Sequence, residues 1–271
     1  MLRDITIGQY YPVESVIHRL DPRTKFLGTI MFVVSLFLFK SFWGFLLAGA
    51  FLVTVTTLAH IPPKYILKGL RPMLFLLLFM MIFTLLMTPG EVIGEWWIFT
   101  VTKEGIFAAL FMGLRLAFLV FGSSLMTYTT TPNKLTSGME SCFGFLKIFK
   151  VPVHELAMMV SIALRFIPIL LEETNKIMKA QQARGADFES GGPVKRAKAM
   201  VPILIPLFVS SFRRAGELAE AMEARCYHGG DGRTKLKPLR YDRRDYLAYV
   251  LLVLYLVLAV LLGRGVIPFT L

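Results

Sequence analysis

Two stretches of the chain end in the same pattern of small and basic residues. The first reads Ala-Gln-Gln-Ala-Arg-Gly over residues 180–185, and the second reads Ala-Met-Glu-Ala-Arg-Cys over residues 221–226. On a helix, the two alanines of each stretch lie on one face, where small side chains allow close approach to a partner. The arginine that follows offers a forked set of donors that matches a carboxylate. This pattern predicts that both stretches dock into acidic grooves on another protein.

The same residues also make good helix ends. The last carbonyl groups of a helix lack partners and carry partial negative charge, which an arginine stabilises, and a following glycine stops the helix. One such motif alone would indicate only a helix end. Two copies, each closing a long helical pattern, favour a pair of contacts. The predicted docking residues are Ala183, Arg184, Gly185, Ala224, Arg225 and Cys226.

The elements that position these ends belong to a membrane protein. The chain has 271 residues, is 55% hydrophobic and carries a formal net charge of +12. Its apolar runs approach the roughly 20 residues that cross a bilayer as a helix. Cys142 and Cys226 have no metal-type spacing, and the basic residues form no nucleic-acid-binding module. We therefore expect an all-α integral membrane protein in contact with lipid, without a metal site or a nucleic-acid partner.

About five spans are expected from the apolar runs. A tight turn near Lys40–Gly44 divides the first long run into two spans. The basic N-terminus and the basic 60–71 loop are predicted to be cytoplasmic, because Lys and Arg gather on that side. The acidic 88–104 loop and the C-terminus are then predicted to lie outside the cell membrane. The predicted spans are 26–39, 42–59, 73–87, 105–126 and 246–262.

Arg115 lies near the middle of the fourth predicted span. A charge at that depth is costly, so it faces protein or water and by default suggests function. The other interpretation is an arginine paired inside the bundle that keeps helices in register, and we favour this structural role.

Between the fourth and fifth spans, two long helices are expected to drive the two docking ends. Residues 133–150 have the spacing of short amphipathic helices, and long helices follow at 151–184 and from Pro193 onward. Each long helix is apolar in its first half and polar in its second, which favours a helix that lies against the membrane and then emerges into water. A true span at 156–171 is the alternative. We expect structural roles for Arg165 and bends at Pro168, Pro202 and Pro206.

The predicted organisation has three parts. Residues 1–128 hold a cytoplasmic N-terminal segment and four spans, residues 129–242 form the cytoplasmic module with the docking ends, and residues 243–271 form the last span and an outer tail. No phosphate-binding loop of the Gly-X-X-X-X-Gly-Lys-Ser/Thr type occurs, so the chain is not expected to be an ATPase. The pair Glu172-Glu173 resembles the paired glutamates of intramembrane CAAX-type proteases. The arginine expected a few residues later in those enzymes is absent, and no histidine lies within the predicted spans.

Several motifs resemble one family. Residues 15–25, Ser-Val-Ile-His-Arg-Leu-Asp-Pro-Arg-Thr-Lys, are similar to the N-terminal signature of the T component of energy-coupling factor (ECF) transporters. Leu-Arg-Phe-Ile-Pro at 164–168 and the two docking ends resemble its central signatures, and the likeness covers almost the whole chain. One departure stands at the second end, where Cys226 replaces the family's glycine. Gly229-Gly230 is then expected to supply the glycine stop.

The resemblance implies a scaffold that joins two cytoplasmic ABC ATPase subunits, identical or different, to a membrane-embedded substrate-binding S component. It implies that Arg184 and Arg225 each meet acidic residues of one ATPase. ATP and Mg would be bound by the ATPases, and this chain would bind no cofactor. The family imports vitamins or metal ions, and the S component, shared or dedicated, sets the substrate. The alternative from another class is a self-sufficient secondary transporter, which would need broken helices and polar groups near the midplane.

Overall fold

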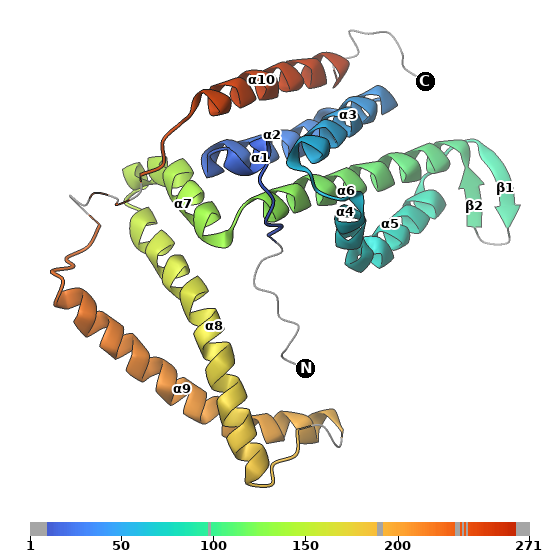
Figure 1. Cartoon of the computed structure of the whole chain (residues 1–271). Helices are drawn as coiled ribbons and strands as arrows, with labels where there is room; N and C mark the ends of the chain where they lie inside the picture. The colour runs from blue at the N-terminus through green and yellow to red at the C-terminus, as the bar shows by residue number, and fades with distance from the viewer. Residues whose placement is uncertain are drawn as a thin grey trace. The chain divides into compact units, whose positions relative to one another are not determined.

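The computed structural model describes residues 10–96, 99–188, 192–230, 234, 236 and 238–263. The described chain is almost entirely helical (Figure 1). In chain order its elements are α1 (Val16–Arg19), α2 (Pro22–Leu38), α3 (Phe42–Ala59), α4 (Pro63–Leu70), the 3-10 helix η1 (Arg71–Met73), α5 (Leu74–Met87), β1 (Val92–Trp96), β2 (Phe99–Thr102), α6 (Lys103–Thr129), α7 (Pro132–Cys142), the 3-10 helix η2 (Phe143–Phe149), α8 (Val153–Ala183), α9 (Pro193–Glu223) and α10 (Arg243–Gly263). The prediction of an all-α membrane fold is confirmed, and so is the turn between α2 and α3.

One small element was not predicted. The loop between α5 and α6 forms an antiparallel hairpin in which Val92 pairs with Thr102 and Trp96 pairs with Phe99. Strands this short depend on pairing with each other, so the local sequence pattern gave only a loop.

The chain forms two compact units. The membrane unit comprises Gly8–Cys142 and Leu239–Leu271, and the paired-helix unit comprises residues 143–238. The paired-helix unit contains η2, α8 and α9. Within the membrane unit, α7 packs against α2. The predicted three-part organisation stays a prediction.

The core of the membrane unit is built around α2. This helix packs against α6, α7 and α10, while α3, α4 and α5 pack against α6. Close approach of α2 and α6 depends on Gly122, because a Cβ there would lie 2.5 Å from a ring carbon of Phe32. Such small-residue contacts are typical of helices packed in membranes. The buried apolar core residues are Phe32, Leu36, Phe39, Phe45, Ala48, Leu52, Ala59, Ile61, Leu125, Tyr128, Tyr255 and Ala259.

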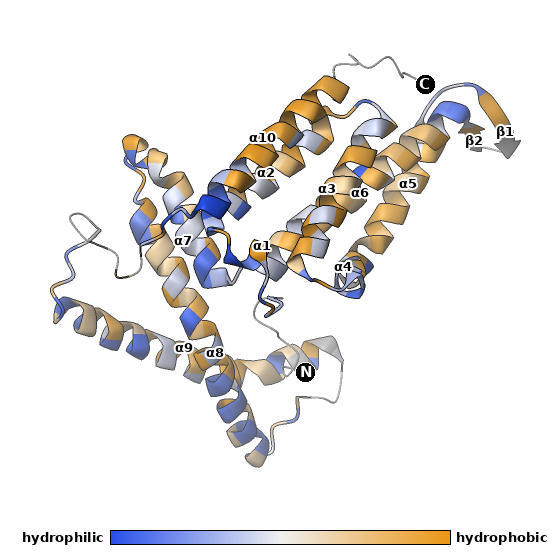
Figure 2. Cartoon of the chain, turned by 45° about the horizontal axis from the view of Figure 1, so that its top comes forward, coloured by the Kyte–Doolittle hydropathy of each residue, from blue (hydrophilic) through white to orange (hydrophobic). Residues whose placement is uncertain are grey.

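Five helices in the described part of the chain have the length and composition to cross a membrane. They are 42–59, 103–129, 153–183, 197–223 and 243–263. Three coincide with predicted spans, whereas the other two are the long helices of the paired-helix unit. The predicted spans at 26–39 and 73–87 form shorter helices, α2 and α5. Hydrophobic residues run along the lengths of α3, α5, α6 and α10 (Figure 2). Whether 156–171 dips into the membrane or spans it stays a prediction.

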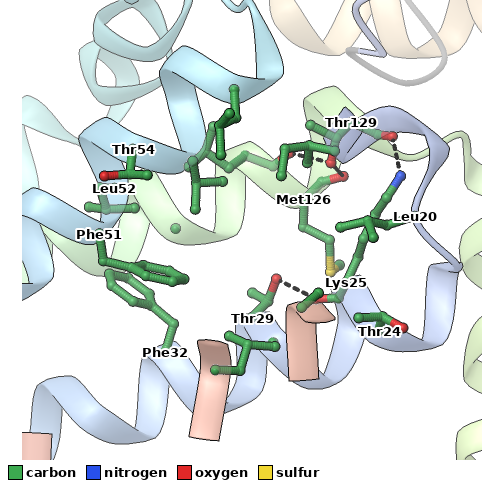
Figure 3. A pocket seen from close by; sticks show the side chains of 18 of the residues that line it. Leu20, Thr24, Lys25, Thr29, Phe32, Phe51, Leu52, Thr54, Met126 and Thr129 are labelled. Carbon is green, nitrogen blue, oxygen red and sulfur yellow. Dashed lines mark hydrogen bonds between the residues drawn. The ribbon is translucent and has the colours of Figure 1, made fainter. Parts of the chain in front are cut away.

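An apolar cavity of about 300 Å³ lies between α2, α3, α6 and α10. Its wall includes Phe32 and Phe51, and Lys25 and Thr129 lie at another part of its lining (Figure 3). The Lys25 ammonium donates to the backbone carbonyl of Thr129 at 2.9 Å. This bond ties the first turn of α2 to the last residue of α6.

His18 fixes the short segment that leads into α2. Its Nε2 lies 3.1 Å from the carbonyl oxygen of Tyr11, and its Nδ1 lies 2.7 Å from the hydroxyl of Ser15. A carbonyl only accepts, so Nε2 carries the proton and Nδ1 accepts from Ser15. Burial, together with the nearby charge of Lys25, lowers the pKa of His18. The neutral imidazole is therefore the form that this segment favours.

Candidate functional site: the two helix ends

The end of α8 is a tight cap centred on Gly185. The N–H of Gly185 donates to the carbonyl of Gln182 at 2.9 Å, and the N–H of Ala186 donates to the carbonyl of Gln181 at 3.0 Å. Gly185 itself has a φ of +86°. This is the Schellman arrangement, in which a left-handed residue after the helix satisfies carbonyls of the last turn. Because glycine adopts positive φ without steric cost, the sequence suits the geometry.

The end of α9 has the same cap with a cysteine in place of the glycine. The N–H of Cys226 donates to the carbonyl of Glu223 at 2.8 Å, and the N–H of Tyr227 donates to the carbonyl of Met222 at 3.0 Å. Cys226 has a φ of +55°. The residues of the two caps correspond one to one, so the backbone turns at the same point of both motifs.

The expectation that Gly229-Gly230 would supply the second stop is therefore wrong. The left-handed residue that closes α9 is Cys226, and Gly229, with a φ of +104°, lies three residues beyond it. Gly230 has another reason to be glycine, since a Cβ there would lie 2.5 Å from an imidazole carbon of His154. The hydrogen bonds that end a helix are local, and here they outweigh the energetic cost of a left-handed conformation at cysteine.

All six predicted docking residues are exposed. Ala180 and Ala183 present small side chains beside Arg184, and Ala221 does the same beside Arg225. Neither guanidinium makes an ion pair within the described part of the chain. Each end thus offers small side chains and a forked cation with no ion pair among the described residues, the combination that fits a groove with a carboxylate at its rim.

The two helices contact each other through an ion pair that the sequence analysis did not single out. A guanidinium nitrogen (Nη2) of Arg214 donates to a carboxylate oxygen of Glu173 at 3.3 Å. The side chains are 34% and 24% exposed, so the pair is partly shielded from water. Figures 1 and 2 show α8 and α9 crossing. Glu173 therefore has a structural partner, which accounts for one of the two adjacent glutamates.

The two members of this ion pair lie at equivalent positions upstream of the two motifs. Glu173 and Arg214 are 41 residues apart, and the same separation relates Arg184 to Arg225 (225 − 184 = 41). Each member of the pair thus precedes its own docking arginine by 11 residues (184 − 173 = 225 − 214 = 11). Aligning the two motifs without gaps would have drawn attention to both positions. The contact divides the helix pair into two polar arms of equal length.

The other predicted structural residues lie along the same helices. Arg165 is exposed on α8, and Pro168 is inside that helix. Pro202 and Pro206 are inside α9, which changes direction along its length in Figure 1. A proline inside a helix removes one backbone hydrogen bond and favours such a bend.

Arg115 lies apart from this site, in the membrane unit. One of its guanidinium nitrogens donates to the carbonyl of Phe39 at 3.3 Å, just after the end of α2. Its guanidinium carbon is 5.1 Å from the ring centre of Phe111 and 5.6 Å from that of Phe37. These contacts join α6 to the end of α2 and favour the structural role.

Comparisons with known proteins show the family of the chain. The model of the family described as "Cobalt transport protein" (CbiQ) matches residues 13–236. A relative from Ruminiclostridium cellulolyticum, "Energy-coupling factor transporter transmembrane protein EcfT", is 50% identical over 262 residues, which cover 97% of this chain and 98% of the relative. The protein of that name from Acidaminococcus fermentans is 53% identical, with 96% and 98% covered. The resemblance to the T component is confirmed, and the chain belongs to the cobalt transport protein (CbiQ) family that contains these energy-coupling factor transporter transmembrane proteins.

Proposed function

We propose that this chain is the coupling subunit of an ECF importer. It transmits ATP-driven motion from two ABC ATPase subunits to a membrane-embedded S component that binds the transported vitamin or metal ion. The observation that carries the proposal is the pair of caps with the same hydrogen-bond pattern, at equal distances from one interhelical contact. Two such ends suit two related sockets, as a pair of ATPase subunits would provide.

The equal arms give the proposal a mechanical basis. Eleven residues of α-helix rise about 16 Å, at roughly 1.5 Å per residue. Closing or opening the two sockets would move the two ends relative to each other about the Glu173–Arg214 contact. The parts of α8 and α9 on the other side of that contact would then move as well. Packed helices shift between discrete arrangements, so such motion can be transmitted without melting either helix.

The apolar halves of the two helices offer a surface for the receiving side. Large apolar side chains stand exposed there, and the most exposed on α9 are about two thirds accessible. We expect the S component and the bilayer to cover this surface. It includes Leu156, Met159, Val160, Ile167, Met200, Val201, Leu204, Ile205, Phe208, Val209 and Phe212.

The chemistry of the cycle is assigned to the partners. ATP and Mg would be bound and ATP hydrolysed by the ATPase subunits, while this chain binds no cofactor and catalyses no reaction. Its relatives are named as transmembrane proteins of a transporter. The substrate would be set by the S component. Mass spectrometry of the purified complex is the direct way to identify that component.

The test reverses the charge at both ends. In Arg184→Glu/Arg225→Glu, the like charges would repel the acidic sockets, and we expect at least about a tenfold loss of co-purified ATPase with membrane insertion unchanged. The matched control is Lys176→Glu/Arg213→Glu, which makes the same charge change at exposed positions of the same two helices. Normal recovery of ATPase with the first variant, or an equal loss with the control, would contradict docking through the ends.

A further inference from the structure

A single carboxylate lies at the start of two helices. Asp245, 2% exposed in the first turn of α10, accepts a hydrogen bond from the backbone N–H of Asp21 at 2.8 Å. Its other oxygen accepts from the backbone N–H of Asp242 at 2.8 Å. Asp21 is the N-cap of α2, and Asp242 immediately precedes α10. Thr24 adds a third bond from its hydroxyl at 3.2 Å.

Two helix N-termini explain why a buried charge is stable here. The first N–H groups of a helix lack partners, and they give that end partial positive charge. The bond from Asp242 to Asp245 is the second half of a capping box, which is a contact within one helix. The bond from Asp21 extends the same carboxylate to a helix that is 224 residues away in sequence. The N-terminal signature is thus completed by a residue near the other end of the chain.

Other residues of the N-terminal signature also bind the first turn of α2 to neighbouring segments. The guanidinium carbon of Arg23 lies 4.3 Å from the ring centre of Tyr241. The Lys25 ammonium bonds the carbonyl of Thr129 at the end of α6 (Figure 3). We call this group the N-terminal clasp; it consists of Asp21, Arg23, Thr24, Lys25, Thr129, Tyr241 and Asp245, together with the backbone N–H of Asp242.

The clasp holds both places where the chain connects to the paired-helix unit. On the outgoing side, α6 is tied through Thr129, and α7 packs so close to α2 that a Cβ on Gly138 would lie 2.9 Å from the Cβ of Pro22. On the returning side, the chain re-enters the membrane unit at Leu239 and reaches Asp245 within one turn of α10. The first turn of α2 therefore anchors the segments on both sides of residues 143–238.

We propose that the N-terminal clasp is the anchor through which the paired-helix unit acts on the membrane helices, with Asp245 as its positioning residue. The inference rests on the proposed coupling function. A moving pair of helices displaces its neighbours only if the connections at both of its ends are held. Loss of the carboxylate would release the first turn of α10 from the start of α2, and motion would then be absorbed there and in residues 239–242 instead of reaching the bundle.

The test compares Asp245→Asn with Asp242→Asn. Both remove one negative charge, but Asp242 is exposed and its side chain bonds only the next backbone N–H among the described contacts. Asn at 245 keeps one of the two acceptor oxygens, so whichever amide of Asp21 or Asp242 then faces the side-chain NH2 group should exchange hydrogen at least about tenfold faster. The complex, purified with its ATPases, is measured by hydrogen exchange with and without ATP.

For Asp245→Asn we expect normal ATPase recovery and a normal ATP response at the two helix ends, together with loss of the ATP response in the membrane unit. Asp242→Asn should keep all three, Asp245→Glu should recover part of the lost response, and Thr24→Val should lie between the variant and the wild type. An ATP response in the membrane unit that survives in Asp245→Asn would overturn the inference. So would a loss in proportion to ATPase recovery, which is what a purely stabilising role gives.

Failure of the proposed function would look different. A wild-type chain that recovers no ATPase contradicts the coupling function itself. The exchange rates of the Asp21 and Asp242 amides in the isolated chain still decide whether Asp245 fixes both helix starts, since unchanged rates in Asp245→Asn would refute the clasp.

Discussion

The ends of α8 and α9 share one backbone geometry but differ at the residue that geometry strains most. Gly185 and Cys226 both have positive φ and both donate to the carbonyl three residues earlier. Glycine adopts this conformation freely, whereas a side chain there costs about 1–2 kcal/mol. The end of α9 therefore keeps the same backbone shape at a cost in stability. The shared feature is the position of the arginine and of the turn, and glycine is one way to obtain it.

The surroundings of the two caps do not explain the difference. A Cβ added at Gly185 would meet no atom within 4 Å, and Cys226 is exposed. Among the described residues, nothing near either cap adds to the penalty of the backbone conformation. This makes the two positions a clean pair for measuring what the glycine contributes.

We expect the largest loss of ATPase recovery from changes to the Glu173–Arg214 contact, from which the two polar arms have equal length. Glu173→Arg would place two cations together at the crossing, and Arg214→Glu would place two carboxylates there. We expect each single change to lower recovered ATPase about fivefold, which corresponds to roughly 1 kcal/mol for a partly exposed pair. The exchanged double variant should return within about twofold of the wild type.

A neighbouring ion pair provides the control for that experiment. Arg213 and Glu217 are 4.0 Å apart on α9 alone, with side chains 72% and 68% exposed. Exchanging those two charges should leave ATPase recovery unchanged. If the single variants at 173 and 214 also have no effect, the contact is not the point about which the arms move.

A more local effect, confined to the stability of the two helix ends, should follow from exchanging the cap residues. Cys226→Gly should stabilise the end of α9 by about 1 kcal/mol, and Gly185→Cys should destabilise the end of α8 by a similar amount. Hydrogen exchange of the capping amides, at Ala186 and Tyr227, measures both changes. The shifts should be about fivefold and opposite in sign. Shifts of the same sign would mean that the two caps are not equivalent.

Local patterns predicted the parts of this fold that local forces decide. The bounds of α8 and α9, the turn before α3 and the position of Arg184 follow from periodicity and helix-stop residues. The end of α9 at Cys226 does not follow from side-chain preference, because the hydrogen bonds of the cap decide where the chain turns. The hairpin of β1 and β2 was missed because strands so short are stabilised by each other.

Long-range polar contacts were the main omission. Asp245 looks like an ordinary acidic residue in the first turn of a helix, and nothing near it in sequence indicates Asp21 as its partner. The contact of Glu173 with Arg214 is easier to find from the sequence, because these residues are 41 positions apart, the same spacing that separates the two helix-end motifs. A repeat is thus informative about contacts as well as about motifs, because equivalent positions of two crossing helices meet at the crossing.

The exposed thiol at the second end offers the most direct test of whether both ends dock on ATPase subunits. In a Cys142→Ser chain, a maleimide photo-crosslinker can be placed on Cys226. A second probe can be placed at the first end, one residue beyond the equivalent position, in Cys142→Ser/Cys226→Ser/Ala186→Cys. Irradiation of the membrane complex should join each probe to an ATPase subunit, identified by mass spectrometry of the adduct. Adducts with lipid or an S component alone, from either end, would contradict the account.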